Sequence, residues 1–293
     1  MRPSFGEGGR VIDSSMLLAD GRTLAFTDAG APGGLPVFYF HGAPGGRLDV
    51  AWMGDAFEKA GVRVVSADRP GYGGSSPSRR RSMSDWSRDI AVLADHLDID
   101  RFAVMGLSSG GPYVAACAAL LADRVVAAAS VAGVTDMGWS AAYDEFPDDA
   151  EKTIMQIGDE DKALAWCEDR YGTDGARFFD APLDLSPPDT ALFTNEAFMT
   201  AIMPTFAEAF RQGVGGFAQD ITVQGRAWPF DVVSITCQMR VYHGEQDTLV
   251  PVSHGRHTAE MIEGSTLVLL PEHGHISMIT EIPRISTDLA DAF

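Results

Sequence analysis

Short apolar runs alternate with segments of helical spacing along most of the chain. The apolar runs predict buried strands at 36–41, 62–68, 101–107, 125–133, 239–244 and 265–270. Helical spacing lies between them, at about 47–60, 84–97, 109–121, 252–262 and from 276 onward. Strands that are apolar on both faces and alternate with helices are typical of a mostly parallel sheet covered by helices on both sides. The pattern therefore predicts a protein of the α/β class.

Two local signals refine this pattern near its beginning. The stretches 14–19 and 22–27 flank Asp20-Gly21, a dipeptide typical of a two-residue hairpin turn. We therefore expect an antiparallel hairpin at one edge of the sheet, which brings the predicted strands to eight. Ser84 fits the N-cap of the helix over 84–97, and the following Asp85 favours the positive end of that helix.

Residues 136–230 break the alternation of strands and helices. Aromatic residues are scattered there among acidic ones, the spacing is helical, and no segment is a convincing strand. Gly and Pro clusters such as Pro187-Pro188 and Gly215-Gly216 separate the pieces. We therefore predict a core domain formed by 1–135 and 231–293, with 136–230 inserted as a helical cap. We expect the cap to lie over the carboxyl edge of the sheet, where open α/β sheets bind their ligands.

The composition of the 293-residue chain excludes several classes of protein. With 45% hydrophobic and 22% charged residues, the chain has an ordinary globular composition. A formal net charge of -19 argues against binding to nucleic acid or to an anionic membrane surface. No run approaches the ~18 apolar residues of a membrane span. The beginning of the chain also lacks the apolar core, of about 7–15 residues, that a signal peptide needs.

The cysteines point to a reduced protein. Cys117, Cys167 and Cys237 are odd in number and lack the spacing of metal ligands, so we expect neither a disulfide scaffold nor structural zinc. We predict a cytoplasmic protein that acts on a small molecule without a cofactor or metal. The sequence leaves the oligomeric state open.

The segment Gly106–Gly111 (G-L-S-S-G-G) carries the sharpest chemical signal. It lies directly after a predicted buried strand and directly before a helix, which is the context of a G-x-S-x-G nucleophile elbow. The strained turn projects the Ser108 hydroxyl over the sheet edge, where the following helix N-terminus favours developing negative charge. A phosphate-binding turn is the alternative, but no Lys follows as in a P-loop and no G-x-G-x-x-G is present.

Three further segments match motifs of one family. They are His41–Gly46 (H-G-A-P-G-G), Asp68–Ser75 (D-R-P-G-Y-G-G-S), and the pair His243–Asp247 (H-G-E-Q-D) with His273–His275 (H-G-H). Together with the elbow they resemble, in this order, the oxyanion loop, the D-x-P-G-x-G-x-S turn, and the acid and base segments of the α/β-hydrolase superfamily. The resemblance covers about 10–135 and 231–293. It implies an α/β-hydrolase fold, with a mostly parallel eight-stranded sheet flanked by helices, a helical cap and a serine hydrolase activity.

The chain order Ser108, Asp247, His275 is the order in which this fold carries its catalytic triad. A serine hydroxyl is a weak nucleophile, so the His275 imidazole must take its proton and the Asp247 carboxylate must orient that imidazole. The backbone N–H groups of Ala43 and Ser109 would form the oxyanion hole of such a site. Each donor of this kind stabilises the transition state by about 2.7–4 kcal/mol.

Other residues compete for some of these roles. His273 lies two residues before His275, and the family pattern favours the second of the two histidines as the base. Asp136 follows the sixth predicted strand, where some relatives carry the acid, and is the alternate to Asp247. We expect His41 to be a structural hydrogen-bonding group. The remaining histidines are expected in packing or at the surface: His243, His254 and His257.

The elbow residue and the missing motifs narrow the chemistry. A serine nucleophile argues against epoxide or carbon–halogen hydrolysis, for which relatives use Asp at the elbow. No dinucleotide fingerprint or metal-ligand cluster suggests other chemistry. We predict hydrolysis of an uncharged carboxylic ester through an acyl-enzyme. Seven residues either line an apolar acyl pocket or form the core of the insertion: Met137, Trp139, Phe198, Met199, Met203, Phe206 and Phe210.

Three alternatives remain open. The loop His41–Gly45 is similar to the H-G-G-P-G loop of proline iminopeptidases, although Ala43 replaces the second Gly and no bulky aromatic residue follows Ser108. Carbon–carbon bond hydrolysis is a second alternative. A small-molecule receptor on the same fold is a third, against which the complete triad argues. In a peptidase, acidic residues of the insertion would suit a substrate ammonium: Asp144, Glu145, Asp148, Asp149 and Glu151.

Overall fold

The computed structural model describes residues 11–53, 56–147, 149–180 and 183–292. One sheet holds eight strands in the order β1-β2-β4-β3-β5-β6-β7-β8. The pairs β1/β2 and β2/β4 are antiparallel and the others are parallel, which confirms the predicted fold class. The strands are β1 (Val11–Leu17), β2 (Thr23–Gly30), β3 (Leu35–Phe40), β4 (Val62–Ala67), β5 (Phe102–Leu107), β6 (Val125–Val131), β7 (Gln238–Gly244) and β8 (Thr266–Leu270).

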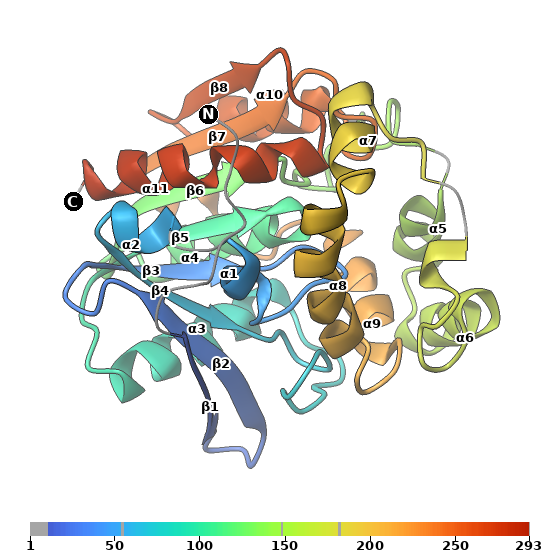
Figure 1. The fold of residues 1–293 in the computed structure, drawn as a ribbon, viewed down its shortest axis with the longest axis horizontal. Coiled ribbons are helices and arrows are strands. Elements are labelled where there is room, and N and C mark those ends of the chain that lie inside the picture. Colours follow the sequence, from blue (N-terminus) through green and yellow to red (C-terminus); the bar gives the residue numbers. More distant parts are fainter. Residues whose placement is uncertain (1–10, 54–55, 148, 181–182, 293) are drawn as a thin grey trace.

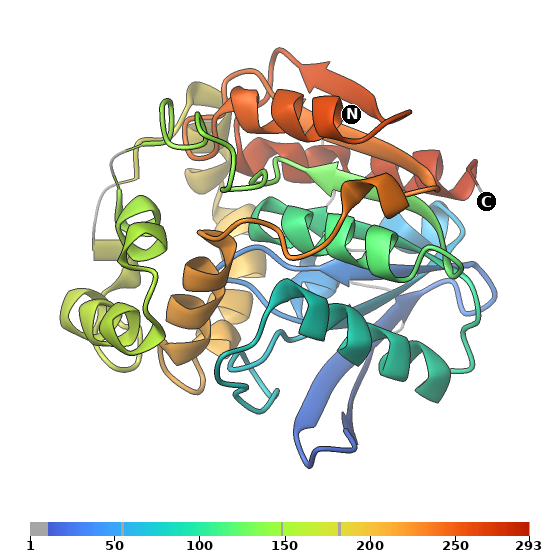
Figure 2. The ribbon, with the colours of Figure 1, turned by 180° about the vertical axis from the view of Figure 1, so that it is seen from behind.

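Helices cover both faces of this sheet. One face packs against helices that Figure 1 shows in front, and the opposite face packs against helices that Figure 2 shows from behind. The front helices are α1 (Asp49–Trp52), α2 (Ala56–Lys59) and α11 (Ile282–Ala290). The rear helices are α3 (Met83–His96), α4 (Gly111–Leu120) and α10 (Val252–Met261).

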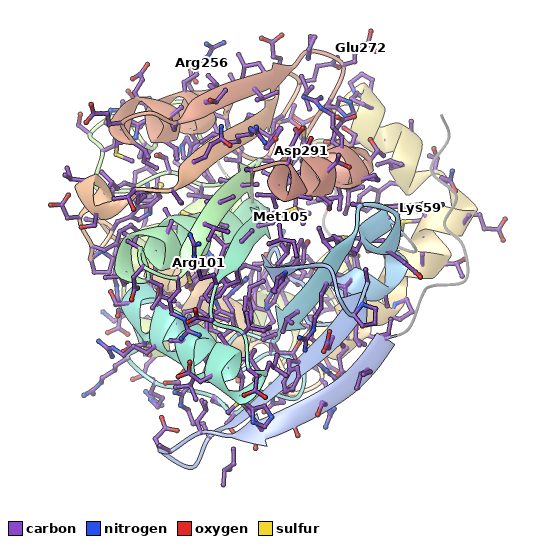
Figure 3. All side chains as sticks on the ribbon, turned by 90° about the vertical axis from the view of Figure 1, so that its left-hand side faces the viewer. Lys59, Arg101, Met105, Arg256, Glu272 and Asp291 are labelled. Atoms are coloured by element: carbon purple, nitrogen blue, oxygen red, sulfur yellow. The ribbon has the colours of Figure 1, made fainter. Side chains whose placement is uncertain are left out.

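The apolar runs divide their side chains between two cores because successive residues of a strand point to opposite faces. In β3, Phe38 and Phe40 join the core under α3 and α4, whereas Val37 and Tyr39 join the core under α1, α2 and α11. Figure 3 shows Met105 of β5 among the central strands, and this side chain is fully buried. Both faces of the central strands β3 and β5 are therefore buried, as their continuous apolar sequence predicts.

Several predicted boundaries differ from the observed ones. The hairpin turn spans 18–22 rather than two residues, and Gly21 takes a φ of 86° in it. Helix α3 begins one residue earlier than predicted and is capped by Ser82, whose backbone N–H donates to Asp85 Oδ2 at 2.7 Å. The predicted helix at 47–60 is two short helices, α1 and α2. The last α-helix begins at Ile282, because Pro283 fits only a first helical turn.

Between β6 and β7 the described residues form helices and no strand. We call the described residues from 150 to 224 the helical insertion. Its α-helices are α5 (Ala150–Ile157), α6 (Glu160–Tyr171), α7 (Pro187–Phe193), α8 (Glu196–Ala209) and α9 (Gly215–Gln224). They lie together at the right of Figure 1 and the left of Figure 2. Apolar side chains of α5, α6, α9 and the end of α8 share one cluster with Tyr72, Val134 and Val250, which follow β4, β6 and β7. The insertion therefore lies over the carboxyl ends of these strands.

Candidate active site

Ser108 lies on a strained turn between β5 and α4. Its φ is 54°, in the left-handed region that a serine rarely adopts. Two glycines make the turn possible. A Cβ on Gly106 would lie 2.5 Å from the carbonyl oxygen of Gly110, and a Cβ on Gly110 would overlap the carbonyl oxygen of Phe40. The turn passes into a short 3-10 helix, Ser108–Gly110, and then into α4, so the serine lies at a helix N-terminus.

The structure brings Ser108, His275 and Asp247 into one hydrogen-bonded chain. Ser108 Oγ lies 2.8 Å from His275 Nε2, and His275 Nδ1 lies 2.8 Å from Asp247 Oδ2. A neutral imidazole with its proton on Nδ1 fits both contacts, since Nε2 then accepts the serine proton. The Asp247 side chain is 0% exposed, and its Oδ1 accepts the N–H groups of Leu249 at 2.9 Å and Val250 at 2.8 Å.

The electrostatics of this chain favour a charged pair between acid and base. Burial lowers the pKa of His275, but the Asp247 charge and hydrogen bond outweigh burial and raise that pKa above its usual value. Burial raises the pKa of Asp247, but the His275 charge and the hydrogen bonds of His243 and His275 hold it well below its usual range. These shifts favour an ionised Asp247 beside His275, an arrangement that would stabilise an imidazolium on His275.

The loop after β3 lies beside Ser108. Gly42, Ala43 and Ser108 line one cavity, and a Cβ on Gly42 would lie 3.5 Å from the Ser108 Cβ. Ser109 follows the nucleophile in the first turn of the 3-10 helix. The predicted oxyanion donors therefore lie on the two segments that flank the Ser108 hydroxyl.

The competing residues have other partners. His273 Nδ1 lies 3.2 Å from the carbonyl oxygen of Ser277. Asp136 Oδ1 accepts the backbone N–H groups of Gly138 and Trp228, both at 2.9 Å. Within the described part of the chain, neither His273 nor Asp136 has a hydrogen bond to a member of the Ser108–His275–Asp247 chain. The geometry thus pairs Asp247, not Asp136, with the candidate base.

A cavity of about 440 Å³ opens above Ser108 and His275. The insertion contributes most of its apolar wall, including the rings of Tyr171, Phe178, Phe179, Phe193, Phe206 and Phe217. Of the seven residues proposed for an acyl pocket, Phe206 lines this cavity. For the others the pocket interpretation is wrong. Met203 is exposed, and the rest pack in or against the apolar cores: Met137, Trp139, Phe198, Met199 and Phe210.

The cavity wall also carries charged groups. Asp49, Asp149, Glu151 and Arg170 line it beside His275. Burial raises the pKa of Asp49 to about 7 and that of Glu151 to about 8. Of the other acidic residues proposed for binding an ammonium, Asp144 and Glu145 are exposed and do not line this cavity. Asp148 lies outside the described residues.

Comparison with known families agrees with this fold and geometry. The model of the α/β hydrolase fold family matches residues 36–282. The chain belongs to the α/β-hydrolase family. This membership confirms the predicted family, fold class and enzyme class of the hydrolase.

The relatives of this α/β-hydrolase include proteins named as hydrolases and esterases. An uncharacterized hydrolase of Bacillus subtilis, YcgS, is 26% identical over 263 residues, which are 88% of this chain and 89% of that protein. A bifunctional esterase/perhydrolase of Acinetobacter calcoaceticus is 25% identical and covers 92% of this chain and 95% of its own. The solved structure of a thermophilic esterase from Thermogutta terrifontis superposes with a TM-score of 0.67 at 22% identity, covering 96% of this chain and 97% of that chain.

None of the described helices combines the length and apolarity that a membrane span requires. The described residues also hold no group of three or more His, Cys, Asp or Glu side chains placed to bind a metal ion.

His243 is a neighbour of the Ser108–His275–Asp247 chain that sequence analysis missed. The side chain is fully buried, and its Nε2 lies 3.2 Å from Asp247 Oδ2 and 3.0 Å from the carbonyl oxygen of Val250. The second ring nitrogen, Nδ1, is buried with no hydrogen-bond partner among the described residues. A proton on Nε2 fits these contacts, so His243 donates toward the candidate acid. The four-residue spacing from His243 to Asp247 was the signal for this contact.

Asp189 of α7 holds the loop that carries His275. Its Oδ2 accepts the backbone N–H of His275 and its Oδ1 accepts that of Ser277, both at 2.8 Å. The Asp189 side chain is fully buried, and Gly274 allows its close approach, since a Cβ there would lie 2.5 Å from Asp189 Oδ2. One carboxylate of the insertion thus fixes the backbone on both sides of Ile276.

We expect Asp189→Asn to lower kcat by about 10- to 100-fold, because displacement of a catalytic group by about 1 Å has effects of this size. The asparagine amide would present N–H groups to a backbone N–H and break one of the two hydrogen bonds. Asp184→Asn is the control, since Asp184 lies shortly before α7 and is exposed. Steady-state kinetics of both variants measure the effect, and equal activities would contradict a role for Asp189 in placing His275.

Proposed function

We propose that this α/β-hydrolase cleaves uncharged carboxylic esters through an acyl-enzyme on Ser108. The observation that carries the proposal is the unbroken chain from Ser108 through His275 to Asp247, with both contacts at 2.8 Å, at the floor of a largely apolar cavity. The same arrangement is what an activated serine requires, whatever the fold.

The first half of the reaction forms the acyl-enzyme. Ser108 Oγ attacks the ester carbonyl carbon while its proton passes to His275 Nε2, and Asp247 stabilises the resulting imidazolium. The carbonyl oxygen becomes an oxyanion between the N–H groups of Ala43 and Ser109. As the tetrahedral intermediate collapses, the ester C–O bond breaks and His275 protonates the departing alcohol.

The second half releases the acid. A water molecule gives a proton to His275 Nε2 and attacks the acyl carbon, which forms a second oxyanion in the same place. Collapse breaks the bond to Ser108 Oγ, which regains its proton from His275. In this proposal the insertion acts as a cap, because its aromatic side chains shield the acyl group from bulk water.

The cavity wall indicates the substrate class. Phe178, Phe179, Phe206 and Phe217 offer apolar surface close to the reacting serine, which favours an apolar acyl or alcohol group over a charged one. The test is a panel of p-nitrophenyl esters with acyl chains from acetate to dodecanoate. We expect turnover of the neutral esters and much weaker turnover of a carboxylate-bearing ester such as the hemisuccinate. If the enzyme hydrolysed none of these esters, the proposal would be overturned.

The activity should rise with pH through the titration of His275. The base must be neutral to accept the serine proton, so activity is lost as pH falls below the pKa of His275 in the free enzyme. Because that pKa is raised above its usual 6.5, the rising limb of kcat/KM should lie above pH 6.5. A profile that is flat from about pH 5 to 9 would contradict His275 as the base.

A second candidate, cleavage of amino-acid esters or amides, is favoured by Glu151 of α5. Glu151 lines an otherwise mainly aromatic wall near His275. Burial raises its pKa to about 8, but the ammonium of an aminoacyl substrate would lower that pKa and pair with the ionised carboxylate. Glu151→Gln should then raise KM for an aminoacyl p-nitroanilide by about 10-fold, the effect of losing about 1.4 kcal/mol of attraction. The KM for a neutral ester serves as the control. Equal KM changes for both substrates would exclude the aminopeptidase.

A further inference from the structure

Asp220 of α9 is the centre of a buried polar cluster. Its Oδ2 accepts hydrogen bonds from Arg69 Nε at 3.0 Å and Nη2 at 2.8 Å. Its Oδ1 accepts hydrogen bonds from Arg81 Nη2 at 2.8 Å and from the Tyr113 hydroxyl at 2.5 Å. The side chains of Asp220 and Arg69 are 0% exposed and that of Arg81 is 1% exposed. Two guanidinium groups share one carboxylate, so these three side chains together carry a net positive charge.

Arg69 also binds the loop beside Ser108. Its Nη1 donates to the carbonyl oxygen of His41 at 2.5 Å, and its Nη2 donates to that of Gly42 at 3.0 Å. The backbone N–H of Arg69 donates to His41 Nε2 at 3.1 Å, so the imidazole proton lies on Nδ1. His41 Nδ1 in turn lies 2.6 Å from the Gly42 carbonyl oxygen. This carbonyl therefore accepts one hydrogen bond from Arg69 and one from His41.

The carbonyl held in this way belongs to the peptide group whose N–H is the first proposed oxyanion donor. A peptide group is planar, and in the trans form its C=O and N–H point in opposite directions. Anchoring the Gly42 oxygen therefore also fixes the direction of the Ala43 N–H. A guanidinium on the carbonyl polarises the peptide group and strengthens the N–H as a donor.

We propose that Arg69 is a positioning residue for the oxyanion hole and that Asp220 of the helical insertion holds Arg69 in place. The inference rests on the proposed acyl transfer at Ser108. It gives the insertion a role besides enclosing the cavity, since α9 lines the cavity through Phe217 and orients the loop on its far side through Asp220.

Arg81 provides a matched control for Arg69. Both guanidinium groups bind Asp220 and both are buried, so the loss of either leaves the carboxylate with one cation. The other hydrogen bonds of the Arg81 side chain go to Gln219 and Tyr113, and none of those in the described chain reaches the loop 41–43. A merely structural role of the cluster predicts similar effects of the two substitutions, whereas oxyanion positioning predicts an effect of Arg69 alone.

The experiment compares Arg69→Met with Arg81→Met in the full chain, using p-nitrophenyl butyrate kinetics and thermal unfolding. We expect both variants to lose thermal stability to a similar degree. Arg69→Met should lower kcat about 10- to 100-fold with KM changed less than about 3-fold, because an oxyanion donor acts mainly in the transition state. Arg81→Met should keep kcat within about 3-fold of the wild type. Equal kcat values in the two variants would overturn the proposal.

A second pair keeps the test decisive if a Met variant does not fold. Arg69→Lys and Arg81→Lys retain the buried charge, but Lys cannot bridge Asp220 and both carbonyl groups as the guanidinium does. We expect kcat to fall in Arg69→Lys and not in Arg81→Lys. If the wild type cleaves no ester, the proposed function fails, and the rate at which fluorophosphonate labels Ser108 still tests the oxyanion hole. Equal labelling rates in the Arg69 and Arg81 variants would then overturn the positioning role.

Discussion

Ser108→Ala should lower kcat by about 10⁴- to 10⁶-fold, because removal of a triad nucleophile leaves only the binding and oxyanion contributions to catalysis. The substitution removes one oxygen from a partly exposed side chain in the cavity wall, so the midpoint of thermal unfolding should change little. Steady-state hydrolysis of a p-nitrophenyl ester and a thermal melt measure the two effects. Retained turnover in a folded Ser108→Ala variant would contradict the serine mechanism.

Ser66→Ala is a suitable control for this experiment. Ser66 is a fully buried residue of β4 whose hydroxyl has no hydrogen-bond partner among the described residues, and it does not line the cavity. We expect this variant to keep the activity of the wild type. A loss of activity in both serine variants would show that the assay responds to general disturbance of the sheet rather than to the nucleophile.

Asp247→Asn should lower kcat by about 10⁴-fold, as loss of the triad carboxylate does in other serine hydrolases with the geometry left intact. The asparagine can still accept the N–H groups of Leu249 and Val250, but its amide would donate to His275 Nδ1. The imidazole proton would then lie on Nε2, so this nitrogen could no longer accept the serine proton. The pKa of His275 should also fall, since the Asp247 charge is what raises it. The pH profile of any residual activity measures this shift.

Asp136→Asn separates the two possible acids. The asparagine oxygen can keep the hydrogen bonds from Gly138 and Trp228, so folding should be preserved. We expect kcat to stay within about 2-fold of the wild type, because surface or turn substitutions of this kind change little. If Asp136→Asn were as damaging as Asp247→Asn, the assignment of the acid would be wrong.

The sequence predicted most reliably those residues whose type is dictated by the local backbone conformation or by burial. Gly106 and Gly110 are needed because neighbouring backbone carbonyl groups approach them too closely for a side chain. The elbow can therefore be recognised from six consecutive residues of the sequence. Likewise, the two-sided apolar runs of β3 and β5 follow directly from burial on both faces. These features are local in the chain, which is why the fold class and the order of Ser108, Asp247 and His275 could be predicted.

Contacts between distant segments could not be predicted in this way. Asp189 lies 86 residues from His275, and Asp220 lies 151 residues from Arg69, yet both carboxylates act through direct hydrogen bonds. Each is one acid among many in an insertion where most acids face water. Only the packing of α7 and α9 shows which of them are buried. The role of the insertion in placing the loops therefore emerged from the structure alone.

The residues that line the cavity could not be predicted from the sequence for the same reason. Phe206 lines the cavity, whereas Phe210, one helical turn later, packs in the core of the insertion. Helical spacing places both on one face of α8 and its C-cap, but that face meets the cavity at one position and apolar neighbours at the other. Phe178 and Phe179 lie in a short 3-10 helix between longer elements and line the cavity. In so short a segment the spacing of apolar residues does not predict which way the side chains point.

The most direct test of an activated serine at Ser108 is labelling with a fluorophosphonate, followed by mapping of the adduct by mass spectrometry. A serine hydroxyl activated by an adjacent base displaces fluoride from the phosphorus far faster than an ordinary hydroxyl does, so labelling reports the serine and its base without knowledge of the natural substrate. We expect one adduct, on Ser108, in the wild type and none in His275→Ala. No labelling of the folded wild type, or equal labelling of both proteins, would contradict a catalytic Ser108–His275–Asp247 triad.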